Sequence, residues 1–299
     1  MNIYQIFTKY QDNNEAIKYL EEKRWGDKPI CVYCKSTKVC KHKEKVTNRL
    51  QCWNCKKSFS VTVGTIFHHS HISLNKWFML IALMRNAKKG LSACQAARDL
   101  GMNRPTVWSM MHRIRKAMQT DEAKLLEGII EMDETYVGGK PRKENRKDDD
   151  EDNKGNPRGR GTKKTPVVGM VEREGKVKAI AVSKLELKAK DLRKLILKSI
   201  DTQNSILITD EYTGYNRVSD IVPHETINHS YEYARGDIHT NTIESFWAIL
   251  KRGLIGQFHW VSKKYLNAYI DEFCYRYNLR NQNDTVAFDD ILGRCIYAK

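Results

Sequence analysis

The stretch HTNTIESFWAILKRG (residues 239–253) has the apolar pattern of a helix that packs on a core. Its large apolar side chains recur every three or four residues and share one helical stripe: Ile243, Phe246, Trp247, Leu250 and, just beyond, Leu254. Glu244 and Lys251 lie at the edge of that stripe, about 90° from its centre. We therefore expect a helix packed on a sheet that half covers both charged side chains. The pair is either a solvated ion pair or an acid and a base directed into a site.

The segments around this helix predict an α/β domain, because strands and helices follow one another in an order typical of a mixed sheet with flanking helices. The run 140–166 is charged and lacks core residues, which predicts a flexible insertion. The other expected elements are a strand at 127–139 (EGIIEMDETYVGG), a hairpin at 166–183 with its turn at Glu174 and Gly175, a helix at 187–200, a buried strand at 205–210 (SILITD), a short strand at 224–230 (HETINHS) and a closing helix at 262–278.

Positive charge is concentrated in the first two-fifths of the chain. Residues 1–120 contain 22 Lys and Arg against 7 Asp and Glu, whereas residues 121–299 contain 30 against 29. This difference favours a module that binds a polyanion, with nucleic acid as the predicted partner, over a uniformly basic surface. No apolar run approaches the length of a membrane span, and the N-terminus lacks the regions of a signal peptide. We therefore expect no membrane association and a reducing compartment.

Two cysteine pairs predict a zinc ribbon. They are CVYC (Cys31, Cys34) and CWNC (Cys52, Cys55), with 17 residues between the pairs. Each CxxC forms a tight turn that directs two thiolates at one cation, and two such turns complete a tetrahedron. Burial as four small hydrophobic residues is the alternative, and the surrounding lysines argue against it. Cys40 and His42 are weaker ligand candidates, and cysteines 94, 274 and 295 are expected in the core.

Residues 92–118 predict a helix-turn-helix after a helix at 74–87. Two helices flank the break Gly101-Met102-Asn103, with Asn103 suited to cap the second and Pro105 to its first turn. An ordinary three-helix bundle is the alternative, which the local positive charge disfavours. The second helix has a core face of Val107, Met110, Met111, Ile114 and Met118. Its outward residues are candidates to contact DNA in a major groove: Arg104, Thr106, Ser109, His112, Arg113 and Lys116.

Three carboxylates fall at positions that suit a site. Asp133 lies in the first strand, on the face opposite Met132, and Asp210 ends the buried strand, where α/β sheets bind ligands. Glu244 follows on the helix. Three such acids can bind hard divalent cations through oxygen, and two cations can activate a nucleophile across a phosphodiester. Because Glu134 and Glu211 are adjacent to the two aspartates, the pattern leaves the choice within each pair open.

Three segments together resemble a known family. The segments MDETYVGGK, ITDEYTGY and HTNTIESFWAILKRGLIGQFHWVSKKYLNAYIDEFCYRYN are similar to those of DDE transposases from prokaryotic insertion sequences of the ISXO type, relatives of the eukaryotic Merlin elements. The resemblance extends over about residues 12–285 and includes the zinc ribbon, the helix-turn-helix and the charged insertion. It implies a ribonuclease-H-like catalytic domain that cuts DNA at element ends and joins it to a target.

The resemblance also implies roles for individual residues. Asp133, Asp210 and Glu244 would bind two Mg²⁺ or Mn²⁺ ions, in addition to one structural Zn²⁺ at the cysteines. Lys251 would contact phosphate near the cut, and its alternative is a surface ion pair with Glu244. Asn241 is a second candidate for the third acid position, because some related transposases carry asparagine there.

The predicted function is therefore a DNA transposase that acts on terminal inverted repeats and target DNA by metal-dependent cleavage and strand transfer. A non-catalytic zinc-ribbon/helix-turn-helix regulator and a hydrolytic nuclease on the same fold are the alternatives. We expect a homo-oligomer on DNA, since two element ends must be joined. The expected location is the cytoplasm and nucleoid in a prokaryote or the nucleus in a eukaryote.

These predictions combine into a multidomain α/β protein. The N-terminal segment and the linker out of the ribbon show further local patterns: an amphipathic helix before the ribbon and a strand at 59–67 (FSVTVGTIF). The expected divisions are an N-terminal helix (1–25), the zinc ribbon (26–67), the helix-turn-helix (72–120), the ribonuclease-H-like catalytic domain (125–285) with its insertion (140–166), and a C-terminal tail (286–299).

Overall fold

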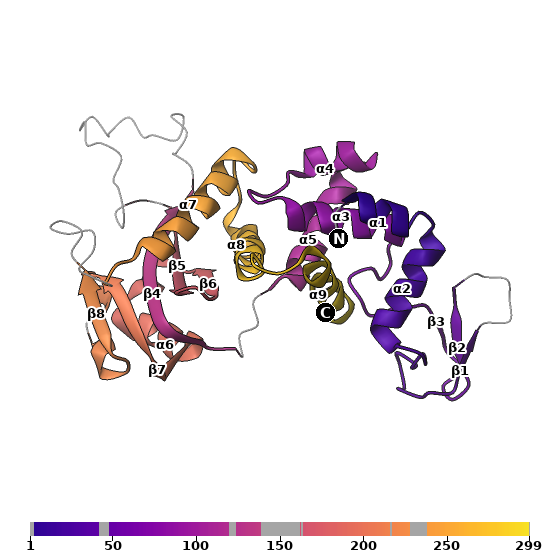
Figure 1. The fold of residues 1–299 in the computed structure, drawn as a ribbon, viewed down its shortest axis with the longest axis horizontal. Helices are drawn as coiled ribbons and strands as arrows, with labels where there is room; N and C mark the ends of the chain where they lie inside the picture. Colours follow the sequence, from indigo (N-terminus) through magenta and orange to yellow (C-terminus); the bar gives the residue numbers. More distant parts are fainter. Residues whose placement is uncertain are drawn as a thin grey trace. The chain divides into compact units, whose positions relative to one another are not determined.

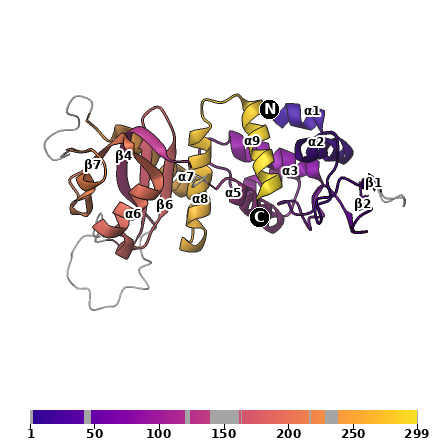
Figure 2. The same cartoon turned by 90° about the horizontal axis from the view of Figure 1, so that it is seen from below.

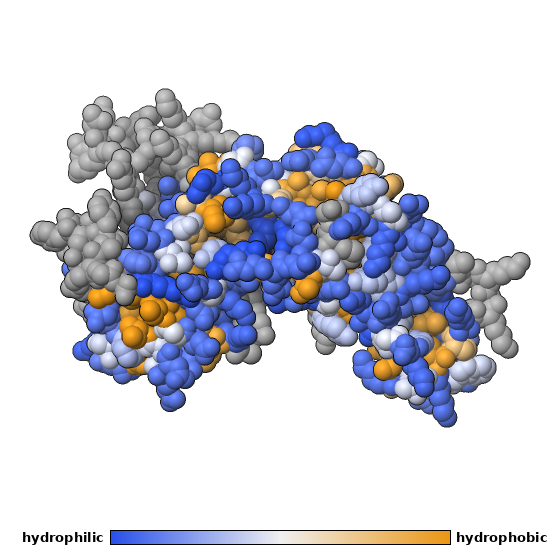
Figure 3. Space-filling view, in the orientation of Figure 1, coloured by the Kyte–Doolittle hydropathy of each residue, from blue (hydrophilic) through white to orange (hydrophobic). Residues whose placement is uncertain are grey.

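The computed structural model describes residues 3–41, 48–119, 124–138, 162, 164–215, 217–227 and 238–298. The chain divides into two compact units, which we call the N-terminal unit (residues 1–118 with 281–299) and the sheet unit (residues 119–280). Hydrophilic residues cover most of the face shown in Figure 3, with apolar residues in smaller patches. Among the described helices, none has both the length and the apolar character that crossing a membrane requires.

A five-stranded mixed sheet organises the sheet unit, as predicted. The strand order is β6-β5-β4-β7-β8, with antiparallel pairs from β6 to β4 and parallel pairs from β4 to β8. Glu174 has a positive φ of 59° in the hairpin turn where the sequence predicts it. The strands are β4 (Leu126–Val137), β5 (Thr165–Glu172), β6 (Val177–Ala181), β7 (Ile200–Asp210) and β8 (His224–Ile227).

Helices cover both faces of this sheet (Figures 1 and 2). Alternate residues of β4 point to opposite faces, so Ile130 and Met132 join a core with Leu192 and Ile196 on one side. On the other side, β5 contributes to a second core with the predicted apolar stripe from Ile243 to Leu254. The helical elements are α6 (Ala189–Ser199) on the first side, α7 (Asn241–Gly256) and α8 (Lys263–Asn278) on the second, and the short 3-10 helices η3 (Lys184–Leu187), η4 (Thr213–Tyr215) and η5 (Val218–Asp220).

The N-terminal unit is built around one apolar helix, α3 (Leu74–Asn86), which matches the predicted helix. Trp77 and Phe78 of α3 are buried, and Phe78 meets Phe288 edge to face at 5.9 Å. The helices that contact α3 are α1 (Ile3–Lys9), α2 (Asn13–Trp25), α4 (Ala93–Leu100), α5 (Arg104–Ala117) and α9 (Asp284–Tyr297).

Both ends of the chain differ from the prediction. The N-terminal segment forms two helices instead of one, because Asp12 is extended (φ −97°, ψ 145°) and occupies the N-cap position of α2. The expected tail 286–299 is largely helix α9, whose Phe288, Ile291 and Cys295 recur at helical spacing and are buried. The C-terminal segment therefore belongs to the N-terminal unit, since an apolar stripe of this kind must be covered.

The zinc ribbon is a three-stranded antiparallel sheet of β1 (Val39–Lys41), β2 (Leu50–Cys52) and β3 (Ser58–Phe59). The predicted strand at 59–67 is wrong beyond Phe59, because the chain continues in turns. Thr65 donates from both its backbone N–H and its hydroxyl to the Thr62 carbonyl, and the hydroxyls of Ser60 and Thr62 pair at 2.9 Å. Such local bonds compete with a strand ladder.

Some expectations fall where the structure gives no description. Most of the expected insertion 140–166 and residues 228–230 of the expected short strand lie outside the described residues, as does His42. Of the cysteines expected in the core, Cys274 and Cys295 are buried, whereas Cys94 is exposed.

Candidate active site

The two predicted aspartates meet at one edge of the mixed sheet. Strands β4 and β7 are parallel neighbours, with Glu131 opposite Ile208, so Asp133 and Asp210 lie two residues farther along each strand. Strand β7 ends at Asp210. The carboxyl ends of parallel strands are where α/β sheets bind ligands. The fold thus brings together two acids that are 77 positions apart in the sequence.

A third carboxylate joins them, and it belongs to Glu134. Asp133, Glu134 and Asp210 each offer an oxygen, and these oxygens lie within 4.8 Å of one another. We call these three residues the carboxylate cluster. The side chain of Glu134 leaves β4 on the face opposite to that of Asp133. The Tyr215 hydroxyl donates to Oε2 of Glu134 at 2.9 Å. The backbone N–H of Tyr212 donates to Oδ1 of Asp210 at 3.1 Å. The segment after β7 therefore fixes two of the three acids.

The electrostatics of the cluster favour a bound cation. Burial, with smaller contributions from the charges of Glu134 and Asp210, raises the pKa of Asp133 to about 7. Burial and the same carboxylates also raise the pKa of Tyr215, so its hydroxyl remains a hydrogen-bond donor. Like charges this close repel, and a hard divalent cation with oxygen ligands removes that repulsion. The donor set and its charge therefore fit Mg²⁺ or Mn²⁺.

Glu244 lies outside the carboxylate cluster formed by the described residues. It belongs to the first turn of α7, and Glu244, Lys251 and Asn241 are all exposed. The expectation that the sheet half covers Glu244 and Lys251 is therefore wrong. Helix α7 is rotated as the sequence predicts, with Ile243 facing the core, but a residue about 100° farther around the helix lies beyond what the sheet covers.

The start of α7 is tied to β4 by a buried residue that the sequence pattern does not single out. Glu131 is fully buried, and its Oε2 accepts the backbone N–H groups of Thr242 (2.8 Å) and Ile243 (3.0 Å). The Arg173 guanidinium donates to Oε1 of the same carboxylate at 2.7 Å. A carboxylate at a helix N-terminus satisfies free N–H groups and the helix dipole. The signal available in the sequence was an acid at an inward position of a buried strand.

Helix α7 also contacts the cluster directly. The indole Nε1–H of Trp247 donates to Oδ2 of Asp133 at 3.0 Å, and Trp247 is otherwise buried in the core beneath α7. The predicted stripe is therefore both core and a polar contact to the site. Sequence periodicity identified the first role only.

The four ribbon cysteines form the second cation site. Their sulfurs lie within 4.8 Å of one another, with Sγ–Sγ distances of 3.6 Å for Cys31–Cys55 and for Cys34–Cys52. A tetrahedral Zn²⁺ with Zn–S bonds of about 2.3 Å places its sulfurs about 3.8 Å apart. The cysteines therefore fit one zinc ion. Cys40 lies outside this group, and its thiol contacts the Gln51 carbonyl at 3.8 Å.

The two CxxC turns share one backbone geometry. In each, the N–H of the first cysteine donates at 3.0 Å to a carbonyl five residues on, at Ser36 and at Lys57. In each, the lysine after the second cysteine has a positive φ of 60°. The backbone hydrogen bond of Ser36 lowers the pKa of the Cys34 thiol to about 6, which favours the thiolate that zinc binds, whereas burial and the three neighbouring thiols raise the pKa of the Cys55 thiol to about 11.

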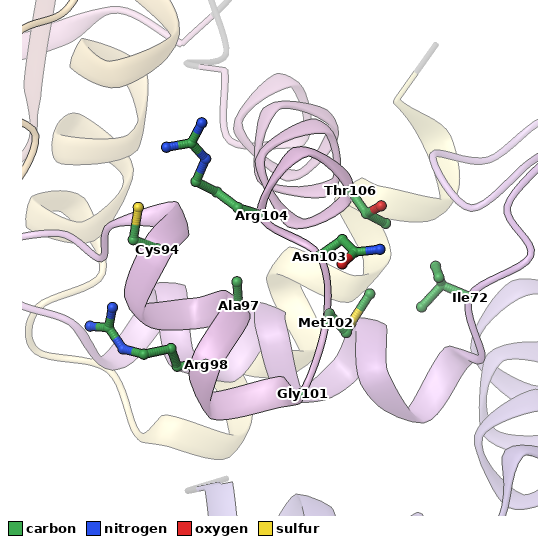
Figure 4. Close-up of a pocket in the computed structure, with 9 residues that line it drawn as sticks. All are labelled: Ile72, Cys94, Ala97, Arg98, Gly101, Met102, Asn103, Arg104 and Thr106. Carbon is green, nitrogen blue, oxygen red and sulfur yellow. The ribbon is translucent and has the colours of Figure 1, made fainter.

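Helices α4 and α5 form at the positions predicted for a helix-turn-helix and are joined through Gly101 in the left-handed conformation. The predicted core face of α5 is buried, and Asn103 occupies the N-cap position without a side-chain capping bond. A hollow of about 670 Å³ lies at the turn between the two helices (Figure 4). Its lining includes Arg98, Arg104 and Thr106. This end of α5 is hollowed and basic, as a surface for a phosphate backbone would be.

The outward residues of α5 are not equally available. Arg104, Ser109 and Lys116 are exposed, whereas Thr106, His112 and Arg113 are partly buried. The Arg113 Nη1 donates to the carbonyls of Ile66 (2.9 Å) and His68 (3.0 Å). Trp108, which was not among the predicted DNA contacts, is 39% exposed, and its ring centroid lies 4.2 Å from that of His112. Arg113 therefore holds the preceding loop onto α5.

Comparisons with known proteins agree with this architecture. Residues 125–278 match the family of ISXO2-like transposase domains, and residues 11–58 match the transposase zinc-ribbon domain. An uncharacterised protein in transposable element ISH50 of Halobacterium salinarum is 27% identical over 271 residues, which cover 88% of this chain and 90% of that protein.

Solved structures of Mos1 complexes are more distant. The Mos1 strand transfer complex is 15% identical with a TM-score of 0.31, over 74% of this chain and 77% of that one. A pre-cleavage Mos1 transpososome is 14% identical with a TM-score of 0.30, over 75% and 79% of the two chains.

Proposed function

The chain belongs to the ISXO2-like transposase family and is a DNA transposase, and we propose that it cuts and joins DNA with divalent cations held by the carboxylate cluster. The observation that carries this proposal is the meeting of Asp133, Glu134 and Asp210 at the carboxyl end of two parallel strands. When bound, two such ions make water or a 3′-hydroxyl nucleophilic and stabilise the leaving oxygen.

The residues of the site are proposed to bind the cations and to hold the ligand carboxylates in position. Asp133 and Asp210 are proposed to bind the cations whichever acid is the third ligand. A hydrogen bond from Trp247 holds the carboxylate of Asp133, and one from the backbone of Tyr212 holds that of Asp210. Glu134 and Glu244 are both candidates for the third acid. Glu134 already lies in the cluster, and Glu244 is exposed on the helix that contacts Asp133.

Lys251 is proposed to contact a DNA phosphate. It lies two helical turns beyond Glu244 on α7 and is exposed, so its ammonium group is accessible to an anion from solution. Asn241 at the start of the same helix remains a weaker candidate for the third ligand.

The N-terminal unit is proposed to hold the element ends. Its positive charge and the hollow at the start of α5 suit a phosphate backbone, and Zn²⁺ at the four cysteines folds the ribbon. Joining two ends requires at least two active sites, so the DNA-bound protein is expected to be an oligomer. The proposed DNA contacts on α5 are Arg104, Thr106, Ser109, His112 and Lys116, with Arg113 contributing through the part of its guanidinium that does not bind the loop.

A strand-transfer assay with pre-cut element ends, the full chain and Mg²⁺ or Mn²⁺ tests the proposal. Joined product should form with the wild type and be lost in Asp210→Asn. The matched control is Asp220→Asn, which makes the same chemical change at a surface ion pair with Arg193 in the same unit. Cleavage without joining would instead indicate a hydrolytic nuclease. DNA binding without metal-dependent chemistry would contradict the proposal.

A further inference from the structure

We propose that Trp247 is a positioning residue for Asp133, and that Gly169 is the residue that makes this position possible. The indole N–H would hold the Asp133 carboxylate in the orientation that binds a divalent cation. This inference rests on the proposed function, because it concerns the same carboxylate. It assigns to two residues of the apolar core a role in the metal site.

The indole N–H of Trp247 donates its hydrogen bond to Asp133 inside the protein. Trp247 is 4% exposed, so its single N–H group cannot be satisfied by bulk water, and it donates to Oδ2 of Asp133 at 3.0 Å. A carboxylate offers about four acceptor positions on its two oxygens. One donor therefore restrains the rotation of the Asp133 carboxylate and leaves lone pairs for a cation.

Gly169 determines where the indole ring can lie. It is the direct cross-strand partner of Asp133 in the β4–β5 ladder. A Cβ atom at residue 169 would lie 2.4 Å from Cη2 and 2.6 Å from Cζ2 of Trp247, closer than real side chains approach. The six-membered part of the ring therefore packs on bare backbone of β5. This contact places the ring over β5, while its N–H reaches the neighbouring residue on β4.

The N-terminal end of α7 is fixed to the same strand. Glu131, two residues before Asp133, accepts the N–H groups of Thr242 and Ile243. Strand β4 therefore holds α7 at its first turn through Glu131, and again one turn later through Trp247 and Asp133. Two attachments to one strand limit both sliding and rotation of the helix. The position of the indole relative to Asp133 is thus set by the fold.

A role in packing alone would require only an apolar ring. Trp247→Phe retains an aromatic ring in the core and removes the N–H donor. If Trp247 only fills space, the metal affinity of this variant should match the wild type. If the N–H orients Asp133, divalent-cation binding should weaken even though the protein stays folded.

The test is Mn²⁺ binding to the zinc-loaded full chain, measured by titration calorimetry. We expect Trp247→Phe to raise the Kd about tenfold, the lower end of what outer-shell hydrogen bonds to metal ligands contribute. Trp260→Phe is the matched control, since Trp260 is 70% exposed in the same unit, and its Kd should equal the wild-type value. Strand transfer by Trp247→Phe should recover as Mn²⁺ is raised, which a purely structural defect would not do.

The outcomes separate this inference from the proposed function. If the wild type binds Mn²⁺, Asp210→Asn does not, and Trp247→Phe binds like the wild type, then the positioning role is wrong and the proposed function stands. If the wild type binds no more Mn²⁺ than Asp210→Asn, both are overturned.

A double-mutant cycle tests Gly169. Gly169→Ala should weaken Mn²⁺ binding in the wild type, because the new Cβ displaces the indole ring. It should have a smaller effect in Trp247→Phe, whose ring lacks the two nearest atoms that the Cβ meets. The third atom, Cδ1 of Ile243 at 3.1 Å, is the end of a flexible side chain and needs to move only a few tenths of an ångström. Gly256→Ala is the control, since a Cβ there meets nothing within 4 Å. An equal loss from Gly169→Ala in both backgrounds would show that Gly169 does not act through the indole.

Discussion

The two cation sites of this chain are assembled in different ways. The ribbon cysteines come from two short turns with the same backbone geometry, and each turn supplies two ligands by itself. The carboxylate cluster has ligands from two strands, and those strands become neighbours only once the sheet has formed. We therefore expect the first site to require its ion to fold a small module, whereas the second is built by a fold that has its own core. The difference predicts opposite responses to loss of metal.

The largest expected effect follows removal of zinc. A strong chelator should unfold the ribbon and weaken DNA binding by at least about a hundredfold, because the ribbon has a small core and depends on Zn²⁺. The sheet unit should stay folded. Residue-resolved NMR spectra of the full chain, with a DNA-binding titration alongside, provide the measurement. Equal loss of signals from both units would contradict the claim that only the ribbon needs its metal ion to fold.

The next effect separates the two candidates for the third acid. Glu134→Gln should weaken Mn²⁺ binding in the absence of DNA by about tenfold, since Glu134 already lies in the cluster. Glu244→Gln is the matched variant, and in the absence of DNA it should bind Mn²⁺ like the wild type because Glu244 lies outside the cluster. Calorimetric titration of both variants measures this. The reverse order of affinities would assign the third position to Glu244.

A smaller effect concerns the stability of the metal-free protein. The pKa of Asp133 is raised to about 7 from an ordinary value near 3.8, so the folded state binds its proton more tightly than the unfolded state. The stability that this proton contributes is lost as the pH rises toward and through 7. At pH 7.5, Asp133→Asn should therefore raise the Tm of the metal-free protein by a few degrees, on the order of what 1–2 kcal/mol produces.

The pH series of melting curves contains its own control. At pH 4.5 the Tm difference between Asp133→Asn and the wild type should be smaller than at pH 7.5. Added Mg²⁺ should raise the Tm of the wild type at pH 7.5 and leave the variant nearly unchanged. A Tm difference that does not change with pH would mean that the charge of Asp133 costs the folded state nothing.

The smallest effect is expected at Cys40. Cys40→Ser should leave one zinc ion per chain, because the Cys40 thiol faces the Gln51 carbonyl and lies outside the four-sulfur group. Cys34→Ser is the contrasting variant and should lose tight zinc binding. Metal analysis of the purified variants checks both. Zinc loss in Cys40→Ser would give that residue a part in the ribbon site.

What the sequence could predict depended on how local the information was. Three predicted features each lie within one short segment, and the structure has all three. They are the CxxC pairs, the core face of α5 from Val107 to Met118 and the apolar stripe on α7. Periodicity places Glu244 at the edge of the stripe, but how far the sheet covers that edge depends on packing, which periodicity does not specify. Helix α9 was missed because it packs on helices from the other end of the chain.

The candidate site could likewise be predicted only where the information is local in the sequence. Asp133 and Asp210 could be selected because each has a clear place relative to a strand. The contribution of Glu134 depends on a hydrogen bond from Tyr215, 81 residues away. The contacts of Trp247 with Asp133 and Gly169 depend on strand register and on a close approach of ring to backbone. These are properties of packing, and a pattern of residue types does not contain them.

The most direct test of the central claim is a crystal structure of the full chain with DNA ends and Mn²⁺, with the anomalous signal used to locate the ions. The account predicts manganese at the carboxylate cluster, within about 2.2 Å of oxygens from both Asp133 and Asp210. It also predicts the DNA phosphate next to the ions. Manganese absent from these two aspartates, in crystals that still contain DNA, would contradict it.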